Sequence, residues 1–67
     1  MNQSILEKAK ALYDSKKSIH KLHKALNDVN LSEFNRKMIE TIIDNANISI
    51  SELQKEYTIE VENALKS

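Results

Sequence analysis

The sequence has no cysteine, no glycine and no proline among its 67 residues, and it has only three aromatic side chains. Without cysteine, neither a disulfide nor a thiolate metal site can stabilise a small core. Strand-rich folds use glycine in hairpin turns and bulges, so the lack of glycine favours an all-α fold with connections made by Asn and Ser. A chain this short forms at most one domain, residues 1–67, and buries only about 60% of its unfolded surface. We therefore expect self-association or a partner to add stability.

Long apolar runs are also missing. No run approaches the roughly 18 residues that span a bilayer, and residues 1–9 lack the apolar core of a secretory signal. We expect a cytoplasmic protein that does not bind a membrane. The frequent use of Lys, Asn, Ile and Ser, with the short length, indicates a phage or mobile-element gene of a low-GC bacterium.

The charges sum to zero but are unevenly distributed. Residues 1–29 carry six lysines against three acids, a net charge of +3, and residues 30–67 carry four basic side chains against seven acids, a net charge of −3. Two interpretations are open. The charges either complement each other within the fold, or the first part of the chain presents a basic face to a ligand.

A first helix is predicted over residues 4–28. Ser4 and Glu7 have the spacing of a capping box, which marks a helix start. The apolar residues that follow form one stripe: Ile5, Ala9, Leu12, Ile19 and Leu26. Lys16 and His23 fall on the same stripe and interrupt its heptad pattern, so we do not expect a long strict coiled coil.

A second helix is predicted over residues 31–46, with Asn30 or Ser32 as its cap. Its apolar residues have the spacing of a helix buried along one broad face: Phe34, Met38, Ile39, Ile42, Ile43 and Ala46. Asn45 and Asn47 provide turn conformations that glycine would otherwise supply. We expect the chain to reverse there.

Ser49 and Glu52 form a second capping box, which predicts a third helix over residues 50–66. Its apolar side chains continue at helical spacing: Ile50, Leu53, Tyr57, Val61, Ala64 and Leu65. This segment is either one continuous helix or two short helices that meet in a turn at residues 58–60. The predicted fold is a small three-helix bundle, and a helix-turn-helix-like C-terminal half is an open alternative.

The stretch from Ser49 to Ala64 resembles the winged-helix gamma domain of FtsK/SpoIIIE-type DNA translocases, whose pattern runs Ser-Ile-Ser-x-Leu-Gln-Arg-Arg-Phe-x-Ile-Gly-Tyr-x-Arg-Ala. Lys55 and Tyr57 are conservative replacements. The identical positions are Ser49, Ile50, Ser51, Leu53, Gln54, Ile59 and Ala64. With the preceding helix, the resemblance covers residues 34–64, and it implies a helix-turn-helix that binds duplex DNA.

The departures from that family concern the groups that would touch DNA. Glu60 stands at the turn glycine, Val61 at the next aromatic and Asn63 at an arginine, and we expect no wing after Ser67. Carboxylates on a reading helix repel phosphate. If DNA is read here, the contacts are Gln54, Asn63 and Lys66, and the two amide side chains are suited to adenine.

Lysines form a second candidate binding surface on the first helix. Lys10, Lys17, Lys21 and Lys24 are spaced by seven, four and three residues, which aligns them along one side of a helix. Such a stripe suits a phosphate backbone or an acidic partner. The alternative is an ordinary solvated face.

No feature of the sequence predicts catalysis. The serines lie at predicted caps or on polar faces, and there is no glycine-rich loop to hold a phosphate or an oxyanion. His20 and His23 are three residues apart, but a metal site would need an acid from another helix. We predict no catalytic residue, no metal and no cofactor.

The sequence therefore predicts a small non-catalytic regulatory module that acts by binding another protein, and that also forms a homodimer. The alternative is a DNA-binding regulator with a wingless helix-turn-helix. Charge, small size and the resemblance motivate these two hypotheses.

Overall fold

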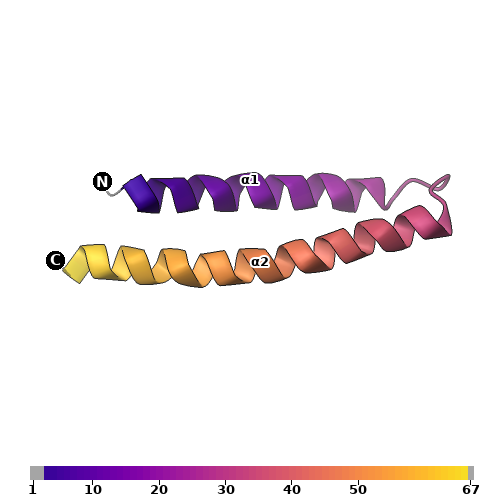
Figure 1. The fold of residues 1–67 in the computed structure, drawn as a ribbon. Coiled ribbons are helices and arrows are strands. Elements are labelled where there is room, and N and C mark those ends of the chain that lie inside the picture. Colours follow the sequence, from indigo (N-terminus) through magenta and orange to yellow (C-terminus); the bar gives the residue numbers. More distant parts are fainter. Residues whose placement is uncertain (1–2, 67) are drawn as a thin grey trace.

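The computed structural model describes residues 3–66, which form two antiparallel helices joined by a short connection (Figure 1). Helix α1 spans Gln3–Ala25, 23 residues, and helix α2 spans Glu33–Lys66, 34 residues. The start of α1 and the end of α2 lie at the same end of the hairpin. The molecule is a rod with extents of 53 × 16 × 13 Å.

The prediction of an all-α fold is confirmed, but the prediction of a three-helix bundle is wrong. The segments predicted as separate helices, 31–46 and 50–66, belong to one continuous α2. Within the described residues the chain does not reverse at Asn45 or Asn47, and residues 58–60 are also helical. The C-terminal half is therefore not helix-turn-helix-like.

The reason for this continuity is the spacing of the side chains by which α2 faces α1. Most residues of α2 that are fully or partly buried recur at alternating intervals of three and four: Arg36, Ile39, Ile43, Ala46, Ile50, Leu53, Tyr57 and Glu60. Partly buried Val61 lies one position beyond this series. The series keeps its phase through residues 47–49, so an unbroken helix keeps both halves against α1. Asn and Ser inside a helix lose only tenths of a kcal/mol each relative to Ala. That loss is smaller than the gain from packing the second half of this series against α1. We call this series on α2, together with the series on α1 that faces it, the seam.

Helix α1 presents a matching series to α2, and it differs from the predicted stripe. Its seam residues, continued by Leu26 just after the helix, alternate at three and four: Ile5, Lys8, Leu12, Ser15, Ile19, Leu22 and Leu26. Lys16 and His23, which were expected to interrupt the stripe, are exposed. Small Ser15 takes the seam position beside Lys16, and Leu22 takes the one beside His23. The spacing of three and four thus continues along α1, but Lys8 and Ser15 are polar members of it, so it is not the strict apolar heptad of a coiled coil.

The buried core is small, because each helix has only one neighbour. Among the described residues, the hydrophobic side chains that are buried are Ile5, Leu12 and Ile43. The broad buried face predicted for residues 34–46 is not formed, since Phe34 and Ile42 on it are exposed. A single partner helix can cover only one stripe of α2.

The connection between the helices is held by side chains that bond to the backbone. The Asn35 amide donates to Ser32 Oγ at 3.1 Å, which makes Ser32 rather than Asn30 the cap of α2. The Asn30 amide donates to Asp28 Oδ1 at 2.9 Å. Arg36 Nη1 donates to the Leu26 carbonyl oxygen at 2.8 Å and so ties α2 to the end of α1. Residues 3–66 contain no positive φ angle, so this turn does not need glycine.

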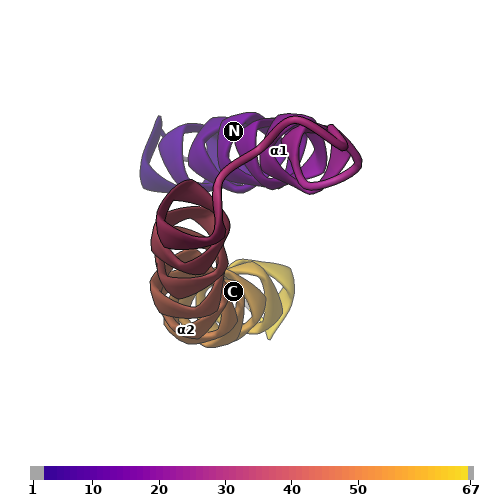
Figure 2. The same cartoon turned by 90° about the vertical axis from the view of Figure 1, so that its right-hand side faces the viewer.

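The hairpin is more extended than a compact domain of its size. Its radius of gyration is 15.6 Å, whereas about 11 Å is typical of 67 residues. Its accessible surface is 5321 Å², whereas a compact protein of this mass exposes about 4300 Å². Viewed along the rod, one helix lies beside the other with no further layer (Figure 2). Much of each helix is therefore open to another molecule.

Candidate interaction surfaces

A polar cluster joins the two helices near the chain ends. Lys8 Nζ lies 2.9 Å from Glu60 Oε1, and the pair is mostly shielded from solvent. Ser4 Oγ donates to both carboxylate oxygens of Glu60 at 3.0 Å and accepts from Lys8 Nζ at 3.1 Å. Ser4 was predicted as a helix cap, but it lies inside α1 and bonds across the hairpin instead.

These bonds act on the ionisation of Glu60. The hydrogen bond from Lys8 lowers its pKa, partial desolvation opposes that change, and the Ser4 bond and the Lys8 charge lower it further. Glu60 is thus held as a carboxylate at a seam position. Because the cluster can form in only one alignment of the helices, it favours a single register of the hairpin.

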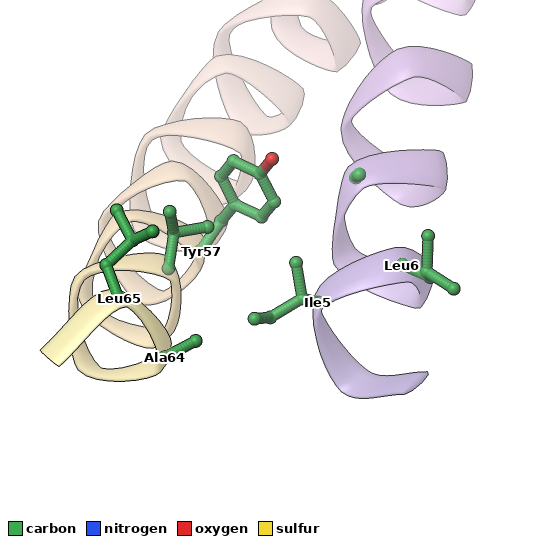
Figure 3. Close-up of a pocket in the computed structure, with 7 residues that line it drawn as sticks. Ile5, Leu6, Tyr57, Ala64 and Leu65 are labelled. Atoms are coloured by element: carbon green, nitrogen blue, oxygen red, sulfur yellow. The ribbon is translucent and has the colours of Figure 1, made fainter. Parts of the chain in front are cut away.

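An apolar groove, here the terminal groove, opens between the helices beside this cluster. It has a volume of about 280 Å³ and is lined by Ile5, Leu6, Ala9, Tyr57, Val61, Ala64 and Leu65. Figure 3 shows Ile5 and Tyr57 extending into the gap between the helices, with Leu6 and Leu65 at its outer edges. The side chain of Leu65 is 82% exposed. The groove is therefore an apolar surface that the hairpin leaves open.

A second apolar surface, here the turn-end strip, runs along α2 near the connection. It consists of Phe34, Met38 and Ile42, four residues apart, which are 72%, 50% and 49% exposed. Ile42 also lines a second hollow of about 270 Å³, whose other lining residues are Asp14, Ser15, Ser18, Ile19, Leu22 and Ala46.

The terminal groove and the turn-end strip lie on opposite flanks of the hairpin. Leu6 and Ala9 of the groove each follow a seam residue of α1 by one position. Asp14 and Ser18, beside the strip, each precede a seam residue by one position. Residues just before and just after a seam position lie on opposite sides of a helix, so two molecules could occupy the two surfaces together.

The lysine stripe is exposed, as predicted, and it faces away from α2. Lys10, Lys17 and Lys24 are seven residues apart and lie midway between seam positions, which places them on the outer side of α1. Lys21 is exposed beside them.

The three DNA contacts predicted on α2 do not join that stripe. Gln54 follows the seam residue Leu53 by one position, whereas Asn63 lies on the other flank and Lys66 at the end of the helix. All three are exposed. The lysine stripe lies on the outer side of α1, so the structure does not bring the predicted binding residues onto one surface.

Sequence reasoning missed the side chains that organise the hairpin, namely Lys8, Arg36 and Glu60. The alternation of three and four residues in α2 was the available signal, because it assigns Arg36 and Glu60 to the same stripe as Ile43. Charged residues at such positions indicate bonds across the seam.

Neither helix has an apolar stretch long enough to cross a membrane. Within residues 3–66, no three acidic or histidine side chains come together in a way that could hold a metal ion. Comparison with protein families, with curated proteins and with solved structures finds no match to this chain.

Proposed function

We propose that this chain is a small non-catalytic regulatory module that acts by binding another protein through the turn-end strip. The observation that carries the proposal is the alignment of three large apolar side chains, Phe34, Met38 and Ile42, which are about half exposed or more on a helix with one neighbour. Contiguous apolar surface of this kind is typical of protein-binding sites.

The spacing of the strip suits a particular kind of partner. Side chains four residues apart share one face of a helix, and an apolar face of this kind is what a helix lays into an apolar groove. Complete burial of one such side chain contributes about 1.5–3 kcal/mol, and the strip holds three that are partly buried already. Of the side chains beside the strip, Asn35 and Asn45 are uncharged and exposed, and Lys37 is charged and exposed. We therefore expect a partner with an apolar groove whose rim forms hydrogen bonds and can also place an acid beside Lys37.

DNA binding is the alternative function, and the lysine stripe alone supports it. Four lysines on one side of α1 could neutralise phosphates along a backbone. Gln54 and Asn63, which would read bases, lie on α2 rather than beside the lysines. A lysine stripe without base contacts would bind DNA without sequence preference.

An affinity pull-down from the native host, read by mass spectrometry, tests the proposal with two matched variants as bait. Met38→Asp places a charge in the strip. Ile59→Asp places the same charge 21 residues further along the same side of α2, where the side chain is exposed to a similar degree. We expect wild type and Ile59→Asp to retain the same protein and Met38→Asp to lose it, with the dissociation constant raised at least about tenfold.

Two results would refute the proposal. One is that Met38→Asp retains the partner as well as Ile59→Asp does, and the other is that wild type retains no protein. Titration of duplex DNA at about 50 mM salt tests the alternative, because binding through lysines weakens steeply as salt is raised.

A further inference from the structure

We infer that two copies of this hairpin associate through the terminal groove, with their chain ends together and with α1 of each copy lying on α2 of the other. The inference goes beyond the proposed function, since it uses a different surface on the opposite flank. Its occupant is a second copy of this chain.

The terminal groove has the composition of an interface core. All seven side chains that line it are apolar or aromatic, and Leu6 and Leu65 at its edges are 46% and 82% exposed. Tyr13 lies seven residues after Leu6, on the same flank of α1, and it is exposed as well. In a twofold dimer the same patch serves both copies, so the leucines at the edge of one groove can fill the other.

The area available on each copy matches what a stable dimer needs. The hairpin exposes about 1000 Å² more than a compact protein of its mass, and a standard interface buries about 800 Å² from each partner. Pairing two hairpins along one flank gives a four-helix bundle, which buries a second stripe on every helix. The excess surface of one copy, which is spread over the whole hairpin, is thus of the size that such an interface buries.

Charge selects the arrangement of the two copies. Helix α1 carries six lysines against two acids, whereas α2 carries seven acids against four basic side chains. Lys10, Lys17 and Lys24 lie on the outer side of α1 rather than on the flank of the terminal groove, so the preference acts through the net charge of each helix. Two hairpins stacked on one flank can place α1 either on α1 or on α2 of the other copy. The first arrangement brings basic helices together, and the second pairs a basic helix with an acidic one. Placing α1 of one copy on α2 of the other also brings the chain ends of both copies to the same end of the dimer, so that the two terminal grooves meet.

Sedimentation equilibrium of the full chain from about 10 to 500 µM tests the dimer. We expect wild type to be a dimer and Leu65→Glu to dissociate it, with a dissociation constant raised at least tenfold. Ile48→Glu is the control, because Ile48 is 60% exposed on the outer side of α2 and should leave the dimer intact. Circular dichroism checks that both variants stay helical. A monomeric wild type, or equal dissociation by the two variants, would overturn the inference.

Disulfide trapping tests the arrangement, since the chain has no cysteine of its own. Tyr13 and Gln54 lie on the same flank of the hairpin. They also lie at nearly the same height along it, because Tyr13 follows Lys8 by five residues and Gln54 precedes Glu60, the partner of Lys8, by six. Mixed Tyr13→Cys and Gln54→Cys chains should cross-link to each other faster than either does to itself. Preferential cross-linking of Tyr13→Cys to itself would show α1 on α1 and overturn the arrangement.

These results separate the inference from the proposed function. A monomeric chain that still retains a protein through Met38 refutes the dimer and leaves the proposed function standing. A dimeric chain that retains no protein supports the dimer and refutes the proposed function.

Discussion

Truncation of two adjacent isoleucines should have very different effects on stability. Ile43 is 5% exposed at the centre of the seam, whereas Ile42 beside it is 49% exposed on the flank. Ile43→Ala removes three buried carbons, worth about 2.4 kcal/mol at 0.8 kcal/mol each, and the cavity left behind places the total at about 2–5 kcal/mol. Ile42→Ala removes the same carbons from a half-solvated site that leaves no closed cavity. We expect it to lower the free energy of unfolding by about 1 kcal/mol, reduced by a few tenths through the higher helix propensity of Ala.

Urea unfolding followed by circular dichroism, at one fixed protein concentration, measures both changes. With a slope of about 1 kcal/mol per molar urea, the two midpoints should differ by more than about 1 M. If Ile43→Ala is unfolded without urea, Ile43→Val provides the comparison, with an expected loss of about 0.5–1.5 kcal/mol. Equal losses for the two alanine variants would refute the reasoning, because a helix covered on both flanks would bury both isoleucines.

Four further changes test the local structure, and urea unfolding measures each of them. Ser32→Ala should lower the free energy of unfolding by about 0.5–2 kcal/mol, because Ser32 caps α2. Ser49→Ala should have no destabilising effect, because residue 49 lies in mid-helix, and a loss like that of Ser32→Ala would indicate a second helix start. Arg36→Met keeps most of the side-chain length but removes the 2.8 Å bond to the end of α1, so we expect a loss of about 1 kcal/mol, and no loss would show that this bond is unimportant. The pKa of Glu60 is lowered in the folded state from its ordinary value of 4.5, so its stabilisation is complete above that value and is lost as the pH falls through the lowered pKa. Wild type should therefore lose more stability than Glu60→Gln on acidification below about pH 4.5, and parallel pH profiles would contradict the role of the Lys8 bond.

The first helix could be predicted from the sequence because its signals are local. Its observed bounds, Gln3–Ala25, lie close to the predicted 4–28. Ile5 and Leu12 were placed on the stripe that packs, and both are buried. Lys16 was also predicted on this stripe, and that prediction is wrong, because Ser15 is the partly buried residue and Lys16 is exposed. Two heptad assignments share Ile5, Leu12 and Ile19, and only the position of α2 distinguishes between them.

The prediction of a third helix is wrong because it relies on the capping-box spacing at Ser49, a local signal, and not on the longer pattern of buried residues that runs through Ser49. Ser49 and Glu52 have capping-box spacing, but a Ser hydroxyl inside a helix can also face solvent, and Ser49 is exposed. The alternation of three and four residues from Arg36 to Glu60 does not change phase at Ser49. A pattern sustained over seven turns outweighs one capping box, since each of its members gains packing energy.

The candidate surfaces could be predicted only in part. The lysine stripe followed from spacing within one helix, and its exposure is as expected. The terminal groove and the turn-end strip depend on which side of α2 meets α1. Phe34 and Met38 have the spacing of a buried face, and they are exposed because residues 3–66 form no third helix that covers them.

One distance measurement tests most directly whether α2 is a single helix in an open hairpin. Asn35→Cys and Glu62→Cys place two spin labels on exposed positions of α2, 27 residues apart. An unbroken helix separates these backbone positions by about 40 Å, at 1.5 Å per residue. Double electron–electron resonance, with labelled chains diluted in unlabelled protein, should therefore give a single distance near 40 Å. A distance below about 20 Å would contradict the account, because it would place residues 50–66 back against residues 31–46, with helix axes about 8–10 Å apart.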